Sequence, residues 1–316
     1  MPASPAVAPV GTLPAWSWGL APALLVCLAA PAFFVLRVPW VGWVLLAAGL
    51  AAALLLERGA QAAPTQTPKP HERTGSGAET VRSRVLGEPG GPGEPRRPSL
   101  LRDLSLIAIG LLIVSAIPLK AELDNLAILR FAIALGGAVA VPYAISRWVY
   151  RDHAIRFPWR GGGRWTWFQW TWLAVVLVLG WLILPFYFIT SGVYLNWPVV
   201  DTPDLIARLF VGVGAVGIWD ELFFICTCFA LLRRHFPFWQ ANLLQMIVFV
   251  SFLWELGYQS WGPLLTIPFA LLMGWIFMRT RSLAYVVSVH LLFDAVVFLV
   301  LVHAHNPGMF DGFFLV

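Results

Sequence analysis

Apolar stretches alternate with short polar ones along most of this chain of 316 residues. A helix needs about 20 consecutive apolar residues to cross the hydrocarbon core of a bilayer, and most of these stretches approach or exceed that length. The pattern predicts an all-α fold, a polytopic integral membrane helical bundle with about nine transmembrane helices. The predicted spans are 16–36, 40–56, 104–118, 126–150, 171–190, 211–232, 239–256, 263–278 and 283–303.

One long polar stretch, 57–103, interrupts this alternation. It is rich in Gly, Pro, Ser and Thr, carries charges of both signs and holds no apolar run that could pack in a core. We therefore predict that it is a disordered cytoplasmic loop. The chain is thereby divided into an N-terminal membrane hairpin (1–56), the loop (57–103), transmembrane helices with an interfacial segment (104–200) and a core (201–316).

The composition supports a membrane protein and argues against a soluble domain, a nucleic-acid-binding protein and a disulfide-rich protein. Hydrophobic residues make up 59% of the chain, charged residues 12%, and the mean hydropathy is +0.77, which is far from the composition of a soluble domain. The net charge of +5 comes mostly from Lys and Arg in loops, so we predict no nucleic-acid partner. The three cysteines lie in apolar stretches, which argues against a disulfide framework.

The basic loops alternate with loops that are nearly free of positive charge. Loops 57–103, 147–164, 233–235 and 279–281 hold most of the Lys and Arg. Because such loops stay in the cytoplasm, we place the N-terminus there and the protein in the plasma (inner) membrane of a prokaryote. Loop 147–164 continues into Trp- and Phe-rich sequence, as is typical at the headgroup level, so membrane lipid is a predicted partner. The sequence sets no oligomeric state.

Ionisable side chains occur in three of the last predicted spans. A charge at the bilayer centre costs about 2.5–3.5 kcal/mol on insertion scales, so such residues usually face a partner or a water-filled cavity. His290 and Asp294 are four residues apart, which puts both on one helix face. Together with acids on two other helices, this pair predicts one shared cavity. The predicted site residues are Asp220, Glu221, Glu255, His290 and Asp294.

Structural pairing is the alternative interpretation of these residues. Asp220 and Glu221 could form salt bridges with Arg130 or Arg208, and Glu255, near the outer end of its helix, could reach water. A lone buried histidine is usually a satisfied core residue. The distribution of ionisable groups over three helices nevertheless favours a shared functional site.

The same residues resemble the motifs of the CPBP (Abi) family of intramembrane proteases, which includes CAAX prenyl endopeptidases. The family pattern is an EExxxR helix, an FxxxH helix, a Gly-containing helix that ends near Arg-Thr-x-Ser-Leu, and an HxxxN or HxxxD helix. The likeness covers roughly residues 205–300, with order and spacing in agreement. The corresponding elements here are Asp220-Glu221, 251–255 with Glu255 at the histidine position, 274–283, and His290-xxx-Asp294.

Three departures from the family pattern bear on mechanism. Asp220 replaces the first Glu, Ile225 replaces the Arg, and Glu255 replaces the His of the second element. An ionised carboxylate can hold a water molecule but cannot stabilise an oxyanion, because it only accepts hydrogen bonds. His290 and Asp294 keep the family pattern.

The resemblance implies an intramembrane endopeptidase that uses carboxylate-activated water on a membrane-associated peptide or protein. Asp220 would then be the base that activates water, with Glu221 supporting it. His290 would position water or donate to the oxyanion, with Asp294 orienting it. Two alternatives stay open: a catalytically altered relative that binds a peptide, lipid or metal ion, and an ion-coupled transporter.

The acids around one imidazole raise the question of a cofactor. Three carboxylates near His290 would repel one another if all were ionised. A protonated acid that donates a hydrogen bond is one solution. A divalent cation is the other, and carboxylates with an imidazole suit zinc, manganese or iron. The sequence leaves both open.

Overall fold

The computed structural model of the chain describes residues 18–62, 98–161 and 163–316, and throughout these ranges the regular structure is helical. The predicted all-α membrane bundle is confirmed. The helices are α1 (Leu20–Phe34), α2 (Pro39–Ala62), α3 (Leu100–Val114), α4 (Asn125–Ala144) with the π-helical η1 (Ile145–Tyr150), α5 (Trp167–Thr190), the 3-10 turn η2 (Val193–Asn196), α6 (Pro203–Asp220), the π-helical η3 (Glu221–Phe229), α7 (Ala230–Arg233), α8 (Phe238–Leu256), α9 (Pro263–Thr280) and α10 (Leu283–His305).

In the described residues, three of the nine predicted spans fall short of the length or apolarity typical of a membrane-crossing helix. Within the described residues, six helical stretches are long and apolar enough to cross a membrane: α2, α4 with η1, α5, the continuous helix Pro203–Arg233, α9 and α10. α1 and α3 have only 15 residues each. α8 has 19 residues but carries polar side chains that bond to α9. Asn242 Nδ2 donates to Leu271 O over 2.8 Å, and Gln245 Nε2 donates to Ala270 O over 2.9 Å.

The predicted loop 57–103 is shorter at both ends. α2 continues to Ala62, and Glu57 on its last turns accepts hydrogen bonds from Ser99 Oγ (2.8 Å) and Leu101 N (3.1 Å). Ser99 is also the N-cap of α3, because its hydroxyl accepts from the backbone of Arg102. The remainder of the predicted disordered loop, 63–97, lies outside the described residues.

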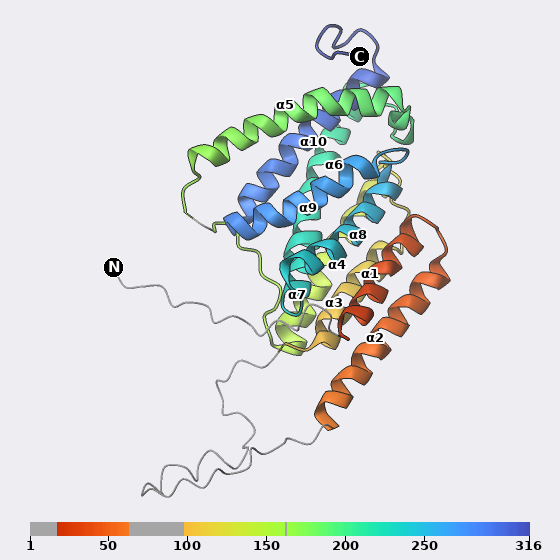
Figure 1. The fold of residues 1–316 in the computed structure, drawn as a ribbon. Coiled ribbons are helices and arrows are strands. Elements are labelled where there is room, and N and C mark those ends of the chain that lie inside the picture. The colour runs from red at the N-terminus through yellow and green to blue at the C-terminus, as the bar shows by residue number, and fades with distance from the viewer. Residues whose placement is uncertain (1–17, 63–97, 162) are drawn as a thin grey trace, which may run out of the picture.

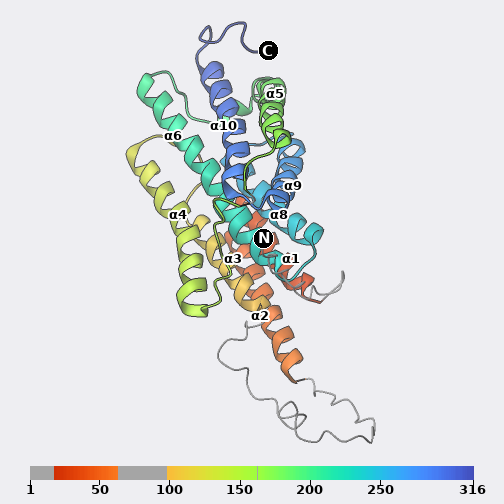
Figure 2. The same ribbon diagram turned by 90° about the vertical axis from the view of Figure 1, so that its left-hand side faces the viewer.

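The helices form two groups around a central layer. In Figure 1 the hairpin of α1 and α2 lies on one side of the molecule and α5, α9 and α10 lie on the other, with α6 and α8 between them. Figure 2 shows α4 and α6 along the same flank. Trp219 Nε1 on α6 donates to Leu135 O on α4 over 2.7 Å, which ties these two helices together. The molecule therefore holds the long helix Pro203–Arg233 at its centre, between α4, α8 and α10.

Aromatic rings fill the space between the central helix and α8. Trp219 stacks on Phe223 with ring centres 5.0 Å apart, and Phe252 of α8 lies 4.9 Å from Trp219. Phe224 meets Phe249 edge-on at 4.9 Å. This packing fixes the rotation of α8 about its axis, because its aromatic side chains must face the central helix.

The segment after η1 holds the beginning of α10. The backbone N–H of Leu283 donates to Pro158 O over 2.9 Å and that of Ala284 donates to Trp159 O over 3.2 Å. These bonds satisfy two of the four N–H groups that the start of a helix leaves without partners. In the same turn, Tyr285 donates its hydroxyl to Gln169 O of α5 over 2.9 Å. α10 is thus anchored at its first turn.

Candidate functional site

The polar site lies where the central helix changes geometry. α6 ends at Asp220, and the π-helical segment η3 begins at Glu221. A π-helix bonds residue i to i+5, and its wider turn occurs frequently at functional sites. At this transition, both of the adjacent acids face the same histidine on α10.

α10 contributes His290 and Asp294 from one face, as their spacing predicted. Gly217 on α6 lets this face come close. A Cβ at Gly217 would lie far inside van der Waals contact of Asp294 Oδ2 and would also touch the His290 ring. Glycine is therefore the residue that permits α10 to approach α6 at this level.

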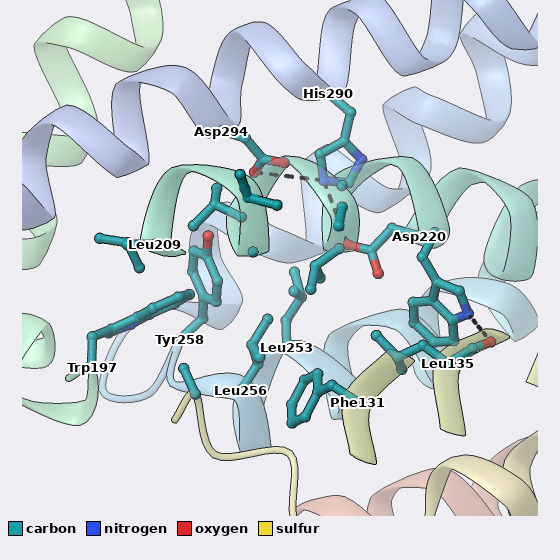
Figure 3. Close-up of a pocket in the computed structure, with 18 of the residues that line it drawn as sticks. Phe131, Leu135, Trp197, Leu209, Asp220, Leu253, Leu256, Tyr258, His290 and Asp294 are labelled. Carbon is teal, nitrogen blue, oxygen red and sulfur yellow. Dashed lines mark hydrogen bonds and ion pairs between the residues drawn. The ribbon is translucent and has the colours of Figure 1, made fainter. Parts of the chain in front are cut away.

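His290 is the centre of the cluster (Figure 3). Its Nδ1 lies 2.7 Å from Glu221 Oε1. Its Nε2 lies 3.5 Å from Asp220 Oδ2 and 3.9 Å from Asp294 Oδ1. The four side chains belong to residues that are at most 7% exposed. Four of the five predicted site residues therefore come together, and Glu221 rather than Asp294 makes the short contact that orients the imidazole.

The cluster contains more acids than bases and more acceptors than donors. Asp220 Oδ1, Glu221 Oε2 and Asp294 Oδ2 are buried without a hydrogen-bond partner. A single imidazolium can balance only one of three carboxylates, so charge balance in this site favours a state in which an acid carries a proton. Buried unpartnered oxygens also mark the position where water or a ligand group would bind.

A divalent cation is the other way in which the acids of the cluster could be balanced. In the described parts of the chain, no group of three or more His, Cys, Asp and Glu residues is placed to hold a metal ion. The zinc, manganese or iron ion considered from sequence stays a prediction.

Glu255 lies outside the cluster, contrary to the prediction that it shares the cavity. It is half-buried, and its carboxylate interacts with the backbone of Leu119 and with the charge of Arg37. The reason is the rotation of α8. Successive helix residues are about 100° apart, so Glu255 lies on nearly the opposite side of α8 from Leu253, which lines the cavity.

The salt bridges considered as an alternative do not form. Arg130 Nη2 pairs with Glu122 Oε2 over 3.0 Å, and Arg208 Nε pairs with Asp204 Oδ2 over 2.8 Å. Neither arginine neutralises the buried acids. The charged cluster is thus not part of a simple structural ion pair with either arginine.

An apolar cavity of about 560 Å³ leads to the cluster, within the range of 300–1,000 Å³ that is usual for ligand pockets. Asp220, His290 and Asp294 form its polar end, as Figure 3 shows. The remaining wall comes mainly from apolar side chains of α4, α6, α8, α9 and α10. These include Phe131, Leu135, Leu209, Val213, Leu253, Leu256, Phe269 and Phe293.

Tyr258 also lines the cavity and was not among the predicted site residues. It follows Gly257, which ends α8 with φ 135 and turns the chain back toward the bundle. Figure 3 shows its hydroxyl pointing to the side of the cavity where Asp294 lies. The sequence signal that could have found it is the Gly-Tyr pair directly after a helix that carries a family motif.

Residues 202–296 match the protein-family model described as Type II CAAX prenyl endopeptidase Rce1-like. The matched range is about a third of the chain and includes all four residues of the cluster. Neither the curated proteins nor the solved structures gave a match. Residues 202–296 of this membrane protein therefore form a domain of the CPBP, or CAAX-protease-like, family.

Proposed function

We propose that the protein is an intramembrane endopeptidase that hydrolyses a peptide bond of a membrane-associated substrate. The observation that carries this proposal is the buried cluster around His290 at the polar end of an apolar cavity. Hydrolysis needs a held water molecule and a base within reach of it. Unpartnered oxygens of Asp220 and Asp294 provide acceptors for such a water molecule.

The contacts assign a role to each group. Glu221 accepts from His290 Nδ1–H and thereby fixes the ring, so that Nε2 faces Asp220 and Asp294. Asp220 takes a proton from the water molecule as its oxygen attacks the carbonyl carbon. The C–N bond then breaks, and the leaving nitrogen receives a proton from the Asp220–His290 pair. Asp294 accepts a second hydrogen bond from the water molecule and positions it.

The lining of the cavity supports one class of substrate. Apart from the cluster, its wall is mainly apolar, although Glu122, Arg208 and Thr266 also line it, so we infer that it fits a peptide that carries a lipid chain or lies within the membrane. The family description names prenyl endopeptidases, and a C-terminal C-a-a-X sequence is where such lipidation occurs. A prenylated C-a-a-X peptide is accordingly the first probe.

The test uses the full-length protein in liposomes and a quenched fluorescent peptide that ends in a prenylated C-a-a-X sequence. We expect cleavage by the wild type, and loss of at least about 100-fold in Asp220→Asn and His290→Gln, as for removal of an acid–base group. Asp204→Asn, an exposed acid on the same helix, is the matched control and should retain full activity. In H₂¹⁸O the label should enter the new carboxylate. Cleavage that is equal in all variants would refute the proposal.

A catalytically altered relative that binds the same peptide is the second candidate. Ile225, at the position of the family Arg, lies in the apolar core, and Glu255, at the position of the family His, faces away from the cluster. Both features remove donors that the family motif supplies. Saturable retention of the uncleaved probe by the wild type, with no product from any variant, would favour this candidate over the peptidase.

A further inference from the structure

The cluster lacks donors for the charge that develops during amide hydrolysis. When water attacks a carbonyl carbon, its oxygen becomes an oxyanion and needs hydrogen bonds from positioned donors. Ionised carboxylates only accept, and the positions of the family Arg and His are Ile225 and Glu255. His290 holds Glu221 with one ring nitrogen and has only Nε2 left. Another donor at the polar end of the cavity is required.

Tyr258 is placed to be that donor. Its residue is 7% exposed, and its ring is held edge-on between Phe188 at 5.6 Å and Trp197 at 5.7 Å. Its backbone N–H donates to Leu253 O over 2.9 Å, which fixes the turn after α8. The ring is therefore rigid, as a preorganised donor must be.

The hydroxyl of Tyr258 is free for a ligand. No hydrogen bond to it is found within the described ranges, and the side chain lines the cavity beside Asp294 and Asp220. The neighbouring Tyr187 differs, because its hydroxyl donates to Gln259 O over 2.7 Å and so has a structural partner. Burial, followed by the charges of Asp294, Tyr187 and Asp220, raises the pKa of Tyr258 well above its usual range. The group thus keeps its proton and remains a donor.

We propose that Tyr258 donates its O–H to the carbonyl oxygen of the scissile bond and to the oxyanion that forms there. This inference rests on the proposed peptidase function. As the water oxygen bonds to the carbonyl carbon, the C=O π electrons move to the oxygen that Tyr258 holds, and Asp220 takes the proton of the water molecule. The C=O bond then re-forms as the C–N bond breaks. Tyr258 donates a hydrogen bond throughout and transfers no proton.

Thr266 of α9 is one competing donor, because it lines the same cavity and is 5% exposed. Trp197 also lines the cavity, and its buried Nε1–H has no partner. The two candidate hydroxyl donors can be tested separately, because a substitution can remove each hydroxyl while it keeps the shape of the side chain nearly constant. Tyr258→Phe removes only the oxygen, and Thr266→Val does the same on α9. Tyr194→Phe, on a ring that packs on His305 outside the cavity, controls for the loss of a tyrosine hydroxyl elsewhere.

The experiment measures kcat and KM on the prenylated reporter peptide for the wild type and these three variants in liposomes. We expect Tyr258→Phe to lower kcat by about 100- to 1,000-fold, as removal of one oxyanion donor does, with KM little changed. Tyr194→Phe should keep the wild-type kcat, and Thr266→Val should lower kcat less than Tyr258→Phe does. Binding of the uncleavable peptide should be equal for wild type and Tyr258→Phe, which would exclude misfolding.

The outcomes separate this inference from the proposal on which it rests. An active wild type with an equally active Tyr258→Phe would overturn the role of Tyr258 and leave the peptidase standing. Loss of kcat in Thr266→Val alone would transfer the role to Thr266. A rise in KM without a fall in kcat would show that Tyr258 only binds substrate. An inactive wild type would overturn both.

Discussion

Gly217 shows how a single missing side chain determines the geometry of the cluster. Asp294 occupies the space that a Cβ at this position would fill. His290 lies one turn away on the same face of α10, so any displacement of Asp294 also moves the imidazole. The approach of α10 to α6 therefore depends on this one residue more than on the acids themselves.

We predict that Gly217→Ala destabilises the protein by about 1–3 kcal/mol, the usual effect of overpacking a buried site. Asp294 must move away from α6 to admit the methyl group. Thermal unfolding in detergent should show a lower Tm. Gly212→Ala is the matched control on the same helix, because a Cβ there meets nothing within 4 Å. Equal Tm values for the two variants would contradict the close approach at Gly217.

Glu221 orients the imidazole, because its Oε1 lies 2.7 Å from His290 Nδ1. We predict that Glu221→Gln reduces peptidase activity by about 10- to 100-fold, since a neutral amide holds the ring with either tautomer. KM for the reporter peptide should stay unchanged. Activity equal to the wild type would show that the ring needs no carboxylate to orient it.

The sequence predicted those contacts in the site that depend only on where residues lie along a single helix. The spacing of His290 and Asp294 fixes a common face whatever the surroundings, and Asp220 and Glu221 are adjacent in sequence. The prediction for Glu255 was wrong because the direction of its side chain depends on the rotation of α8 about its axis. Packing against Trp219 and its neighbours determines that rotation. Tyr258 was not predicted because the direction of its side chain depends on the turn that follows α8. The spacing of residues along one helix does not reveal how that helix packs against others.

At the scale of elements, the segment 157–161 acts as a cap for α10. Gly161 makes this possible, because a Cβ there would lie far inside van der Waals contact of the backbone of Arg281. The two hydrogen bonds from Leu283 and Ala284 depend on that proximity. The cap is thus sensitive to one methyl group.

We predict that Gly161→Ala separates this segment from the first turn of α10. Hydrogen exchange at the amides of Leu283 and Ala284 should become faster, because their acceptors Pro158 and Trp159 move away. Gly59→Ala, where a Cβ meets nothing within 4 Å, should leave exchange at both amides unchanged. Unchanged exchange in Gly161→Ala would show that the cap tolerates a side chain.

A second contact between elements joins α3, the α7–α8 turn and the segment after η1. Arg234 Nη1 donates to Asp103 Oδ1 over 2.7 Å and to Asp152 Oδ2 over 3.1 Å, and His235 Nε2 lies 2.6 Å from Asp103 Oδ2. Burial raises the pKa of Asp152, but hydrogen bonds from Ser146 and Ala154 and the charge of Arg234 lower it more, so the net shift is downward.

A lowered pKa gives this contact a defined pH dependence. The stabilisation from Asp152 is fully present above the ordinary aspartate pKa of about 3.9 and is lost as the pH falls through the lower folded-state value. We predict that the free energy of unfolding of Asp152→Asn differs from that of the wild type at pH 7 and that the difference shrinks below about pH 4. Asp204→Asn, with an exposed carboxylate, should show little difference at either pH. A difference that grows on acidification would refute the assignment.

The elements themselves were largely predictable. Each predicted apolar stretch contains a helix in the described parts of the chain, because in lipid the backbone must satisfy its hydrogen bonds internally. Among the described residues, α1, α3 and α8 are shorter or more polar than the six helical stretches that meet the length and apolarity of a membrane-crossing helix. Hydrophobicity alone does not separate a helix buried in protein from one that crosses the bilayer.

At the scale of the whole molecule, the sequence predicts an orientation in the membrane. Loop 147–164 is basic and should lie in the cytoplasm, whereas the C-terminus should lie outside. The three native cysteines are buried, so the background for thiol labelling is low. Exposed positions in the two regions, Arg164 and Asp311, are suitable reporters.

We predict that an impermeant maleimide labels Arg164→Cys only after the cytoplasmic face is opened and labels Asp311→Cys in intact cells. The unsubstituted protein, with its buried thiols, provides the background. Five crossings separate the two positions when α8 is counted with α5, Pro203–Arg233, α9 and α10, so labelling of both positions from the same face would show that α8 does not cross the membrane. The reverse pattern would invert the predicted orientation.

The π-helical segment Glu221–Phe229 has a consequence for how the central helix can change in length. Each i→i+5 bond encloses one residue more than an α-helical bond, so a helix that enters and leaves this geometry contains a surplus residue. Removal of one residue between 222 and 229 would restore ordinary α-helical bonding while preserving the phase of α7 relative to α6. The same deletion elsewhere in Pro203–Arg233 would rotate every later side chain by about 100°. The π-helical segment next to the acids is therefore the place where this helix can lose a residue. That change would remove the wide turn that lets Asp220 and Glu221 both face His290.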